Sequence, residues 1–304
     1  MIQHSNMGIF RWSFTKRRIE TANQVSLDEG NTDLRKIDGI FFKCEYGNPT
    51  GSIKDRGVAF QISGLKQKAI KKAVIASSGN AAISSANYCQ PAGIDLTIFV
   101  PKKININKLR KLSALKVKTV STETPVKDSI NFSKKEKAYN LRHSRDDSVL
   151  YGYETIAYEL IEENIKPDAI FIPVSSGSAM EGIYRGFARR KVNPPSFHLV
   201  QTEHVHPVAS IYDKDFKQKN NSLADGIVAR VTPREMKLIE IINKTKGSGW
   251  VVSDSDIKKA HCFLKEKGLL SGYEGASALS ALWKARKKGY KFKTPVCILT
   301  GMFY

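Results

Sequence analysis

Cysteine is scarce in this sequence, and the four that occur, at positions 44, 89, 262 and 297, are far apart. No C-x-x-C pair is present, which argues against a zinc ribbon and against a disulfide framework. The thiols are therefore expected to be buried in a reducing compartment, and we assign no residue to a metal.

Long hydrophobic runs are also missing. No stretch of about 18 consecutive apolar residues occurs, so no segment is expected to span a membrane. The first residues, MIQHSNMGIFRWSFTKRR, lack the apolar core that follows the basic start of a secretory signal. These two absences lead us to expect a cytoplasmic protein with no membrane partner.

Acidic residues are few relative to basic ones, since 29 Asp and Glu stand against 49 Lys and Arg, for a formal net charge of +20. Such an excess is typical of nucleic-acid-binding proteins. Here, however, the basic residues are scattered along the chain, and the runs at 134–137 and 284–288 contain no interleaved aromatic residue. We therefore expect no nucleic-acid partner, and a diffuse positive field that attracts small anionic substrates.

Strand-like and helix-like segments alternate along most of the chain. Short apolar runs such as KAVIAS (72–77), DLTIFVP (95–101) and DAIFIPV (168–174) predict buried strands. Segments with apolar residues at helical spacing follow them, such as EGIYRGFARR (181–190). Repeated alternation of this kind predicts mostly parallel sheets with helices on both faces.

One short stretch, YGNPTGSIKDRG (46–57), places a lysine in an unusual position. Pro49 and Gly51 predict a turn, and the apolar spacing after it predicts a helix that begins at or near Lys54. A lysine at a helix N-terminus is unfavourable with the helix dipole, which prefers anions. Spacing alone is also compatible with an ordinary exposed turn lysine, whereas a functional lysine would have a lowered pKa and a bound group as its target.

Two further loops each join a predicted strand to a predicted helix, namely ASSGNAA (76–82) and IPVSSGSAMEG (172–182). Their small side chains and free backbone N–H groups at a helix N-terminus are suited to a carboxylate or a compact phosphate. Neither matches the P-loop or the G-x-G-x-x-G pattern, which disfavours a nucleotide site. Each loop taken singly is also compatible with a plain strand-to-helix turn.

Taken together, these motifs resemble the fold-type II pyridoxal-phosphate enzymes, and most closely their threonine synthase branch. NPTGSIKDRG is similar to the lysine motif of the family, and GIFRW (8–12) and LDEGNTDL (27–34) are similar to the N-terminal segment of that branch. Other similar segments follow in the order of the family: ASSGNAA, FVPKKININKLRKL, TIAYEL, PVSSGSAMEGIYRGF, LADGIVAR and ILTG. The similarity covers nearly the whole chain.

The resemblance implies a role for individual residues. Lys54 is the expected catalytic residue, and its amine would form a Schiff base with pyridoxal 5′-phosphate. Asn80 would hydrogen-bond the 3′-oxygen of the cofactor, and Thr300 would face its pyridine nitrogen. The expected phosphate-binding loop consists of Ser175, Ser176, Gly177, Ser178 and Ala179. The residues expected beside the substrate carboxylate are Ser77, Ser78 and Ala81.

The resemblance also implies two three-layer α/β domains with mostly parallel sheets and the cofactor in the cleft between them. Residues 1–72 and 151–304 are expected to form the larger domain, which holds the cofactor phosphate. Residues 73–150 are expected to form a smaller inserted domain. A small amino-acid substrate is the expected partner, and a homodimer is compatible with the resemblance.

The implied activity is that of a lyase of amino-acid biosynthesis that converts O-phosphohomoserine to threonine and phosphate. The stretch RDDSVLYGYET (145–155) departs from the pattern of the branch, because Asp146 and Asp147 stand where Asn-Pro is expected. Carboxylates there would repel a substrate phosphate, unless Arg142, His143 or Arg145 compensates.

Two alternatives therefore stay open. One is a β-replacement or β-elimination enzyme of the same cofactor class, similar to cysteine synthases or to serine and threonine dehydratases. The other is a catalytically silent cofactor-binding or basic interaction protein, although the presence of Lys54 argues against silence.

Overall fold

The computed structural model describes residues 8–102, 106–115, 117–229 and 231–302. Residues 103–105 of the FVPKKININKLRKL motif and Arg230 of the LADGIVAR motif lie outside these ranges. The chain folds into two compact units. Unit 1 takes its described residues from Met1–Gly30 and Asn48–Gly152, and unit 2 takes its own from Asn31–Gly47 and Tyr153–Phe303.

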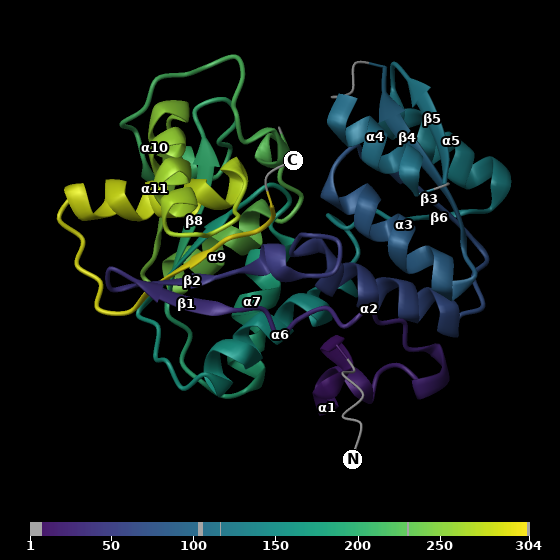
Figure 1. The fold of residues 1–304 in the computed structure, drawn as a ribbon, viewed down its shortest axis with the longest axis horizontal. Coiled ribbons are helices and arrows are strands. Elements are labelled where there is room, and N and C mark those ends of the chain that lie inside the picture. The colour runs from purple at the N-terminus through teal and green to yellow at the C-terminus, as the bar shows by residue number, and fades with distance from the viewer. Residues whose placement is uncertain (1–7, 103–105, 116, 230, 303–304) are drawn as a thin grey trace. The chain divides into compact units, whose positions relative to one another are not determined.

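Unit 1 is built around a four-stranded sheet in the order β5-β4-β3-β6. Every strand pair in it is parallel. The strands are β3 (Lys72–Ala76), β4 (Asp95–Pro101), β5 (Lys118–Thr122) and β6 (Tyr139–Asn140). The helices of this unit are α2 (Lys54–Gln67), α3 (Asn80–Ala92), α4 (Ile106–Ala114) and α5 (Pro125–Glu136), as Figure 1 shows.

Alternating residues of these strands pack on opposite faces of the sheet. Ala73 and Ile75 of β3 belong to the same apolar core as the buried residues of α2 and α3. Val74, between them, instead packs with Phe99 and with Phe132 of α5. The period of two that is expected of a strand therefore produces three layers, with α2 and α3 on one face and α5 on the other.

The N-terminal segment of the described chain is part of the unit 1 core. It contains the 3₁₀ turns η1 (Gly8–Arg11) and η2 (Thr21–Asn23) and the short helix α1 (Ser13–Lys16). Ile9 and Phe10 are buried against the α2 side of the core, and the ring of Phe10 stacks on Phe60 with the centroids 6.3 Å apart. The buried carboxylate of Glu29 accepts hydrogen bonds from Ile9 N and from the hydroxyl of Tyr88 on α3.

Unit 2 contains a six-stranded sheet in the order β1-β2-β10-β7-β8-β9. The strands β1 (Leu34–Ile37) and β2 (Ile40–Lys43) form an antiparallel hairpin, and β2 then continues the sheet in parallel with β10. The remaining strands are all parallel: β7 (Ala169–Pro173), β8 (Ser196–Thr202), β9 (Ser248–Val252) and β10 (Pro295–Ile298).

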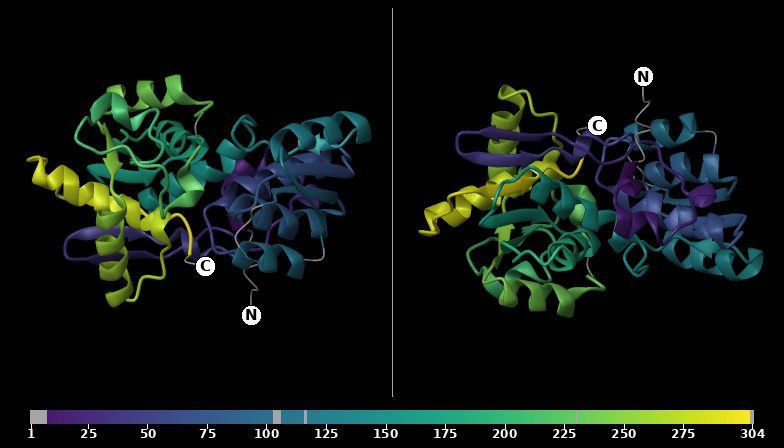
Figure 2. Two further views of the ribbon diagram at one scale, coloured as in Figure 1. Left: turned by 90° about the horizontal axis from the view of Figure 1, so that it is seen from above. Right: turned by 90° about the horizontal axis from the view of Figure 1, so that it is seen from below.

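Helices cover both faces of the unit 2 sheet, as the views in Figure 2 show. One face packs on α10 (Asp254–Glu266) and α11 (Tyr273–Lys287), through strand residues such as Phe171 and Trp250. The helices α6 (Val149–Glu162), α7 (Ser178–Arg189) and α9 (Glu235–Lys244) belong to the other side. The short elements η3 (Glu45–Gly47), α8 (Ala209–Tyr212) and η4 (Asp225–Ile227) lie in the connections.

The observed units differ from the expected domains for residues 1–30 and 48–72. Both segments were assigned by the sequence to the larger domain, yet in the structure they group with residues 73–152. The physical reason is the packing of α2, whose buried face shares a core with α3 and with the N-terminal segment. The expected α/β class with mostly parallel sheets is confirmed.

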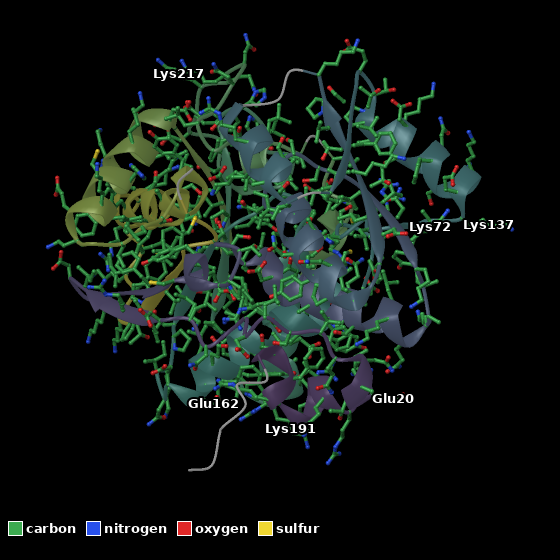
Figure 3. All side chains as sticks on the ribbon, turned by 45° about the vertical axis from the view of Figure 1, so that its right-hand side comes forward. Glu20, Lys72, Lys137, Glu162, Lys191 and Lys217 are labelled. Carbon is green, nitrogen blue, oxygen red and sulfur yellow. The ribbon has the colours of Figure 1, made fainter. Side chains whose placement is uncertain are left out.

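The excess positive charge is distributed over the exposed positions of both units. The labelled side chains of Lys72 and Lys137 in unit 1 and of Lys191 and Lys217 in unit 2 point outward in Figure 3, and all four are exposed. In the ranges that the structure describes, no helix is both long enough and apolar enough to cross a membrane.

Two glycines in helix interiors should respond in opposite ways to replacement by alanine. A Cβ at Gly186 of α7 would lie 2.5 Å from the carbonyl oxygen of Glu154 and 2.8 Å from Ala157 Cβ on α6. We expect Gly186→Ala to lower the free energy of unfolding by about 1–3 kcal/mol, because two packed helices must move apart.

Gly64 of α2 is the matched control, since the nearest atom to an added Cβ there is Ile19 Cδ1 at 3.8 Å. Gly64→Ala is expected to raise the stability by about 0.5–1 kcal/mol through helix propensity alone. Urea unfolding of both variants measures the difference, and equal stabilities for the two would contradict the packing of α6 on α7.

Candidate functional site

Lys54 is the first residue of α2 and follows a tight turn. The turn is closed by a hydrogen bond from Gly51 N to Asn48 O of 2.8 Å, and Gly51 has a φ of +84°, which glycine adopts without strain. Thr50 N donates to the carboxylate of Asp55 at 2.7 Å, and the Thr50 hydroxyl donates to the same carboxylate. These hydrogen bonds connect the turn at 48–51 to the first turn of α2, in which Lys54 lies.

The same carboxylate connects α2 to α3. Ser84 Oγ on α3 donates to Asp55 Oδ1 at 2.6 Å, and both residues are fully buried. Asn80 and Ala81 are the first residues of α3, directly after the loop that contains Ser77 and Ser78. Asn80 and Ala81 therefore lie on a helix that is hydrogen-bonded to the helix of Lys54, and Ser77 and Ser78 lie in the loop directly before it.

The loop at 77–79 has an ordered backbone at the carboxyl end of β3. Ser77 N donates to Phe99 O of the neighbouring strand at 3.2 Å, and Gly79 N donates to Ser77 Oγ at 3.3 Å. α3 starts immediately afterwards, and the N–H groups of Ala82 and Ile83 donate to Gly79 O at 2.9 and 3.2 Å. The N-terminus of this helix lies at the carboxyl end of β3, where an anionic group such as a carboxylate is favoured.

Burial lowers the pKa of Lys54 from its ordinary value. His143, which follows β6 in the chain, is buried as well, and its pKa falls to about 3 because of burial and then because of the positive charge on Lys54, against a smaller opposing effect of Asp146. The imidazole of His143 is therefore neutral at pH 7. A lysine whose pKa is lowered holds a larger fraction of neutral amine, which is the form that attacks a carbonyl or accepts a proton.

Asp146 is held in place on the loop after β6. Its carboxylate accepts hydrogen bonds from Gln61 Nε2 on α2 at 2.6 Å, from the Tyr139 hydroxyl at 2.8 Å and from Ser148 N at 2.9 Å. Burial by itself raises the pKa of Asp146, but the hydrogen bonds from Ser148 and Gln61 outweigh it and leave the pKa below its usual value. This position, where the sequence departs from the threonine synthase pattern, thus carries a fixed negative charge.

In unit 2, the expected phosphate loop joins β7 to α7. Its residues run from Ser175 to Ala179, and α7 begins at Ser178. Gly177 has a φ of +91°, and a Cβ at this position would lie 2.7 Å from Leu238 Cδ1 of α9. Only glycine satisfies both constraints, so the backbone can turn there and direct the N–H groups of the helix N-terminus toward a bound anion.

Two residues that the sequence reasoning missed support this loop. Thr232 Oγ1 donates to Ser175 O at 3.2 Å. Arg234 is largely buried, donates from Nε to Ser178 Oγ at 3.2 Å and forms an ion pair with Glu181 in the first turn of α7, at 2.7 Å. The short polar segment TPRE, shortly after LADGIVAR, was the only signal for them in the sequence.

Thr300 lies at the same sheet edge as this loop. The parallel pairing of β10 with β7 sets Cys297 opposite Phe171, so the residues that follow both strands emerge side by side. Within unit 2 the structure therefore brings Thr300 close to the carboxyl end of β7, from which the expected phosphate loop starts. The backbone of Leu299 and Thr300 lies directly against Gly275 of α11, where a Cβ would be 3.0 Å from Leu299 Cα.

The residues of each unit fit pyridoxal 5′-phosphate. The loop of unit 2 has the small side chains and the helix N-terminus that suit a phosphate group, and Arg234 holds Ser178 of this loop in place. Thr300 supplies a hydroxyl, which suits a neutral ring nitrogen. Unit 1 supplies Lys54, whose pKa is lowered by burial, which suits covalent attachment to an aldehyde.

Comparison with known proteins agrees with this fit. Residues 25–301 match the family described as pyridoxal-phosphate dependent enzymes. The chain is 26% identical to the threonine synthase of Methanocaldococcus jannaschii, over 99% of this chain and 81% of that enzyme. It is 29% identical to a catabolic L-threonine dehydratase of Staphylococcus aureus, over 86% of this chain and 78% of that enzyme.

A solved structure confirms the expected fold class. Maize serine racemase superposes with a TM-score of 0.78 at 19% identity, over 90% of this chain and 89% of that one. At that level of identity the likeness concerns the fold.

The lowered pKa of Lys54 predicts how the stability of the cofactor-free chain depends on pH. Between the lowered pKa of the folded state and about 10.5, the unfolded chain binds more protons than the folded chain, so stability rises with pH. Lys54→Met removes this contribution. We expect the variant to be more stable than the parent chain at pH 7, with an advantage that shrinks as the pH approaches 10.

Urea unfolding at several pH values, after removal of the cofactor, measures the difference between the two proteins. Lys68→Met is the matched control, because Lys68 directly follows α2 and is exposed. A constant difference between Lys54→Met and the parent chain over this pH range would show that the folded state does not perturb Lys54.

Proposed function

Because this chain belongs to the pyridoxal-phosphate dependent enzyme family, we propose that it is a lyase of the threonine synthase type. In this reaction O-phosphohomoserine is converted to threonine and inorganic phosphate. The substrate reaches the site as an amino acid with a second, phosphorylated end. The positive field of the chain, with a formal net charge of +20, favours the approach of such an anion.

The observation that carries this proposal is the N-terminal segment. Residues 8–24 precede the part of the chain that matches the family as a whole, yet Ile9, Phe10 and Ile19 are buried in the core of unit 1. The similarity to the threonine synthase of M. jannaschii extends over 99% of the chain, whereas that to the threonine dehydratase of S. aureus extends over 86%. The match to the threonine synthase therefore reaches into this N-terminal segment, which supports the proposal.

The proposed chemistry assigns a task to each expected residue. Lys54 would hold the cofactor through its amine until the substrate amine displaces it, and the released neutral amine would then accept the α-proton of the substrate. Asn80 orients the cofactor from the start of α3, and the N–H groups near Ser77, Ser78 and Ala81 bind the substrate carboxylate. When bound, pyridoxal 5′-phosphate supplies an electron sink for the negative charge that remains on the substrate.

The residues of unit 2 are proposed to anchor and tune the cofactor. The loop Ser175–Ala179 holds the phosphate, and its shape is fixed by Thr232 and Arg234. Thr300 offers a hydroxyl to the pyridine nitrogen in place of a carboxylate, so this nitrogen carries less positive charge than it would beside an Asp. Such an arrangement favours elimination over reactions that need a stronger electron sink.

A second candidate is elimination from serine or threonine, as in dehydratases, and Asp146 is the observation that favours it. Its carboxylate is fixed by Gln61 and Tyr139, and its pKa lies below the usual value, so it is charged at neutral pH. A fixed negative charge on this loop disfavours a phosphorylated substrate and is neutral toward a hydroxyl leaving group.

Replacement of Lys54 tests the catalytic assignment. Lys54→Ala is expected to lose the yellow colour of the enzyme-bound cofactor and to lower turnover by about 10²–10⁴-fold, because both the covalent attachment and the base disappear. Absorption spectra and initial rates measure the two effects. Lys68→Ala, an exposed change next to the same helix, should retain colour and rate. An active Lys54→Ala enzyme would refute the assignment.

The substrate is tested by two assays on the same holoenzyme preparation. Release of inorganic phosphate from O-phosphohomoserine is expected to exceed the release of ketoacid from serine or threonine by at least about tenfold in kcat/KM. The reverse order would identify the enzyme as a dehydratase and would place the cause at Asp146. In that case Asp146→Asn, which keeps the shape of the side chain and removes its charge, should improve phosphate release.

A further inference from the structure

A second pocket lies entirely within unit 2 and is lined by residues other than those expected at the cofactor. It has a volume of about 610 Å³ and is formed by the loop at 214–217, the end of β9 and the helices α10 and α11. Val251 and Val252 of β9 form its buried floor, and Phe216 and Trp283 supply aromatic surface. A cavity of this size, with apolar and charged lining side chains, is large enough for a small organic molecule.

A buried hydroxyl lines this pocket without a partner. Ser280 of α11 is 2% exposed, and among the described residues no group forms a hydrogen bond with its Oγ. Buried hydroxyl groups are nearly always hydrogen-bonded, and an unsatisfied one costs free energy. A ligand that accepts a hydrogen bond from Ser280 would remove this cost.

The charged groups of the pocket leave a positive excess. Lys284 is fully engaged, since its ammonium contacts Asp213 at 2.6 Å and Val251 O at 2.8 Å. Glu203 accepts a hydrogen bond from the backbone N of Lys217 at 3.1 Å. In the described part of the chain, the ammonium groups of Lys217 and Lys287 form no ion pair.

We propose that this pocket binds a small organic anion, with a flat apolar body against Trp283 and a carboxylate or phosphate group that accepts hydrogen bonds from Ser280, Lys217 and Lys287. Five lysines and three carboxylates, those of Glu203, Asp215 and Asp256, line the pocket, so its formal charge of 5 − 3 = +2 matches an anionic head group. The aromatic and valine surface matches a planar hydrophobic body. The site is distinct from the phosphate loop at Ser175–Ala179, with which it shares no lining residue.

The proposal is tested by titration of the holoenzyme, whose cofactor site is already filled. The probes are benzoate, phenyl phosphate and benzyl alcohol, which share one apolar body and differ in the head group. Isothermal titration calorimetry and tryptophan fluorescence report binding. We expect one or both anions to bind and benzyl alcohol to bind at least about tenfold more weakly. The stronger of the two anions identifies the head group as a carboxylate or a phosphate.

Variants decide whether binding occurs at this pocket. Ser280→Ala and Lys287→Ala are each expected to weaken binding about five- to tenfold. Because Ser280 donates no hydrogen bond in the free protein, Ser280→Ala should not lower the melting temperature, which separates a binding role from a structural one. Lys258→Ala is the matched control, since Lys258 is exposed on α10 and does not line the pocket.

Three results would overturn the proposal. The first is that neither anion binds, and the second is that benzyl alcohol binds with the same affinity as the anions. The third is that Lys258→Ala weakens the binding of the anion as much as Lys287→Ala does, which would indicate a general effect of charge. None of these measurements uses turnover, so they remain decisive whatever reaction the enzyme catalyses.

Discussion

The carboxylate of Asp55 organises the part of unit 1 that contains Lys54 and the start of α3. It accepts hydrogen bonds from the N–H and the hydroxyl of Thr50, before α2, and from Ser84 on α3. Because it is fully buried, these bonds act in a medium of low dielectric, where they are strong and where the loss of any one is costly. The helices that begin at Lys54 and at Asn80 are thus connected through one carboxylate. A carboxylate in the first turn of α2 also interacts favourably with the helix dipole, which Lys54 opposes.

The burial of Lys54 lowers the stability of the folded chain, and packing elsewhere in unit 1 offsets this loss. An ammonium group in this position is disfavoured by desolvation, and the same environment keeps His143 neutral. At neutral pH, unit 1 thus carries a lysine with a lowered pKa and an uncharged imidazole that is subject to the charge of this lysine. The first residue of α2 therefore destabilises the fold. The large apolar core, which α2 shares with α3 and the N-terminal segment, offsets this loss.

Short-range pattern was sufficient to predict most strands and the start of α2, because a buried strand and a helix N-terminus each leave a local signal. The position of the loop Ser175–Ala179 between a strand and a helix was likewise predicted, from the apolar run before it and the helical spacing after it. Arg234 was missed because its partners Ser178 and Glu181 lie more than fifty positions away in the chain. The grouping of α2 with residues 73–152 was missed for the same reason, since it follows from helix packing that no local pattern encodes.

The segments of this chain to which we assign the chemistry and the choice of substrate are held by different carboxylates. Lys54 and its turn depend on hydrogen bonds of Asp55, whereas the loop after β6 depends on those of Asp146. Gln61 connects the two, because it lies two helical turns after Lys54 on α2 and donates to Asp146 at 2.6 Å. A change in the loop at Asp146 would therefore also act on the helix that begins at Lys54. The proposed substrate determinant and the proposed base are thus linked through one hydrogen bond to α2.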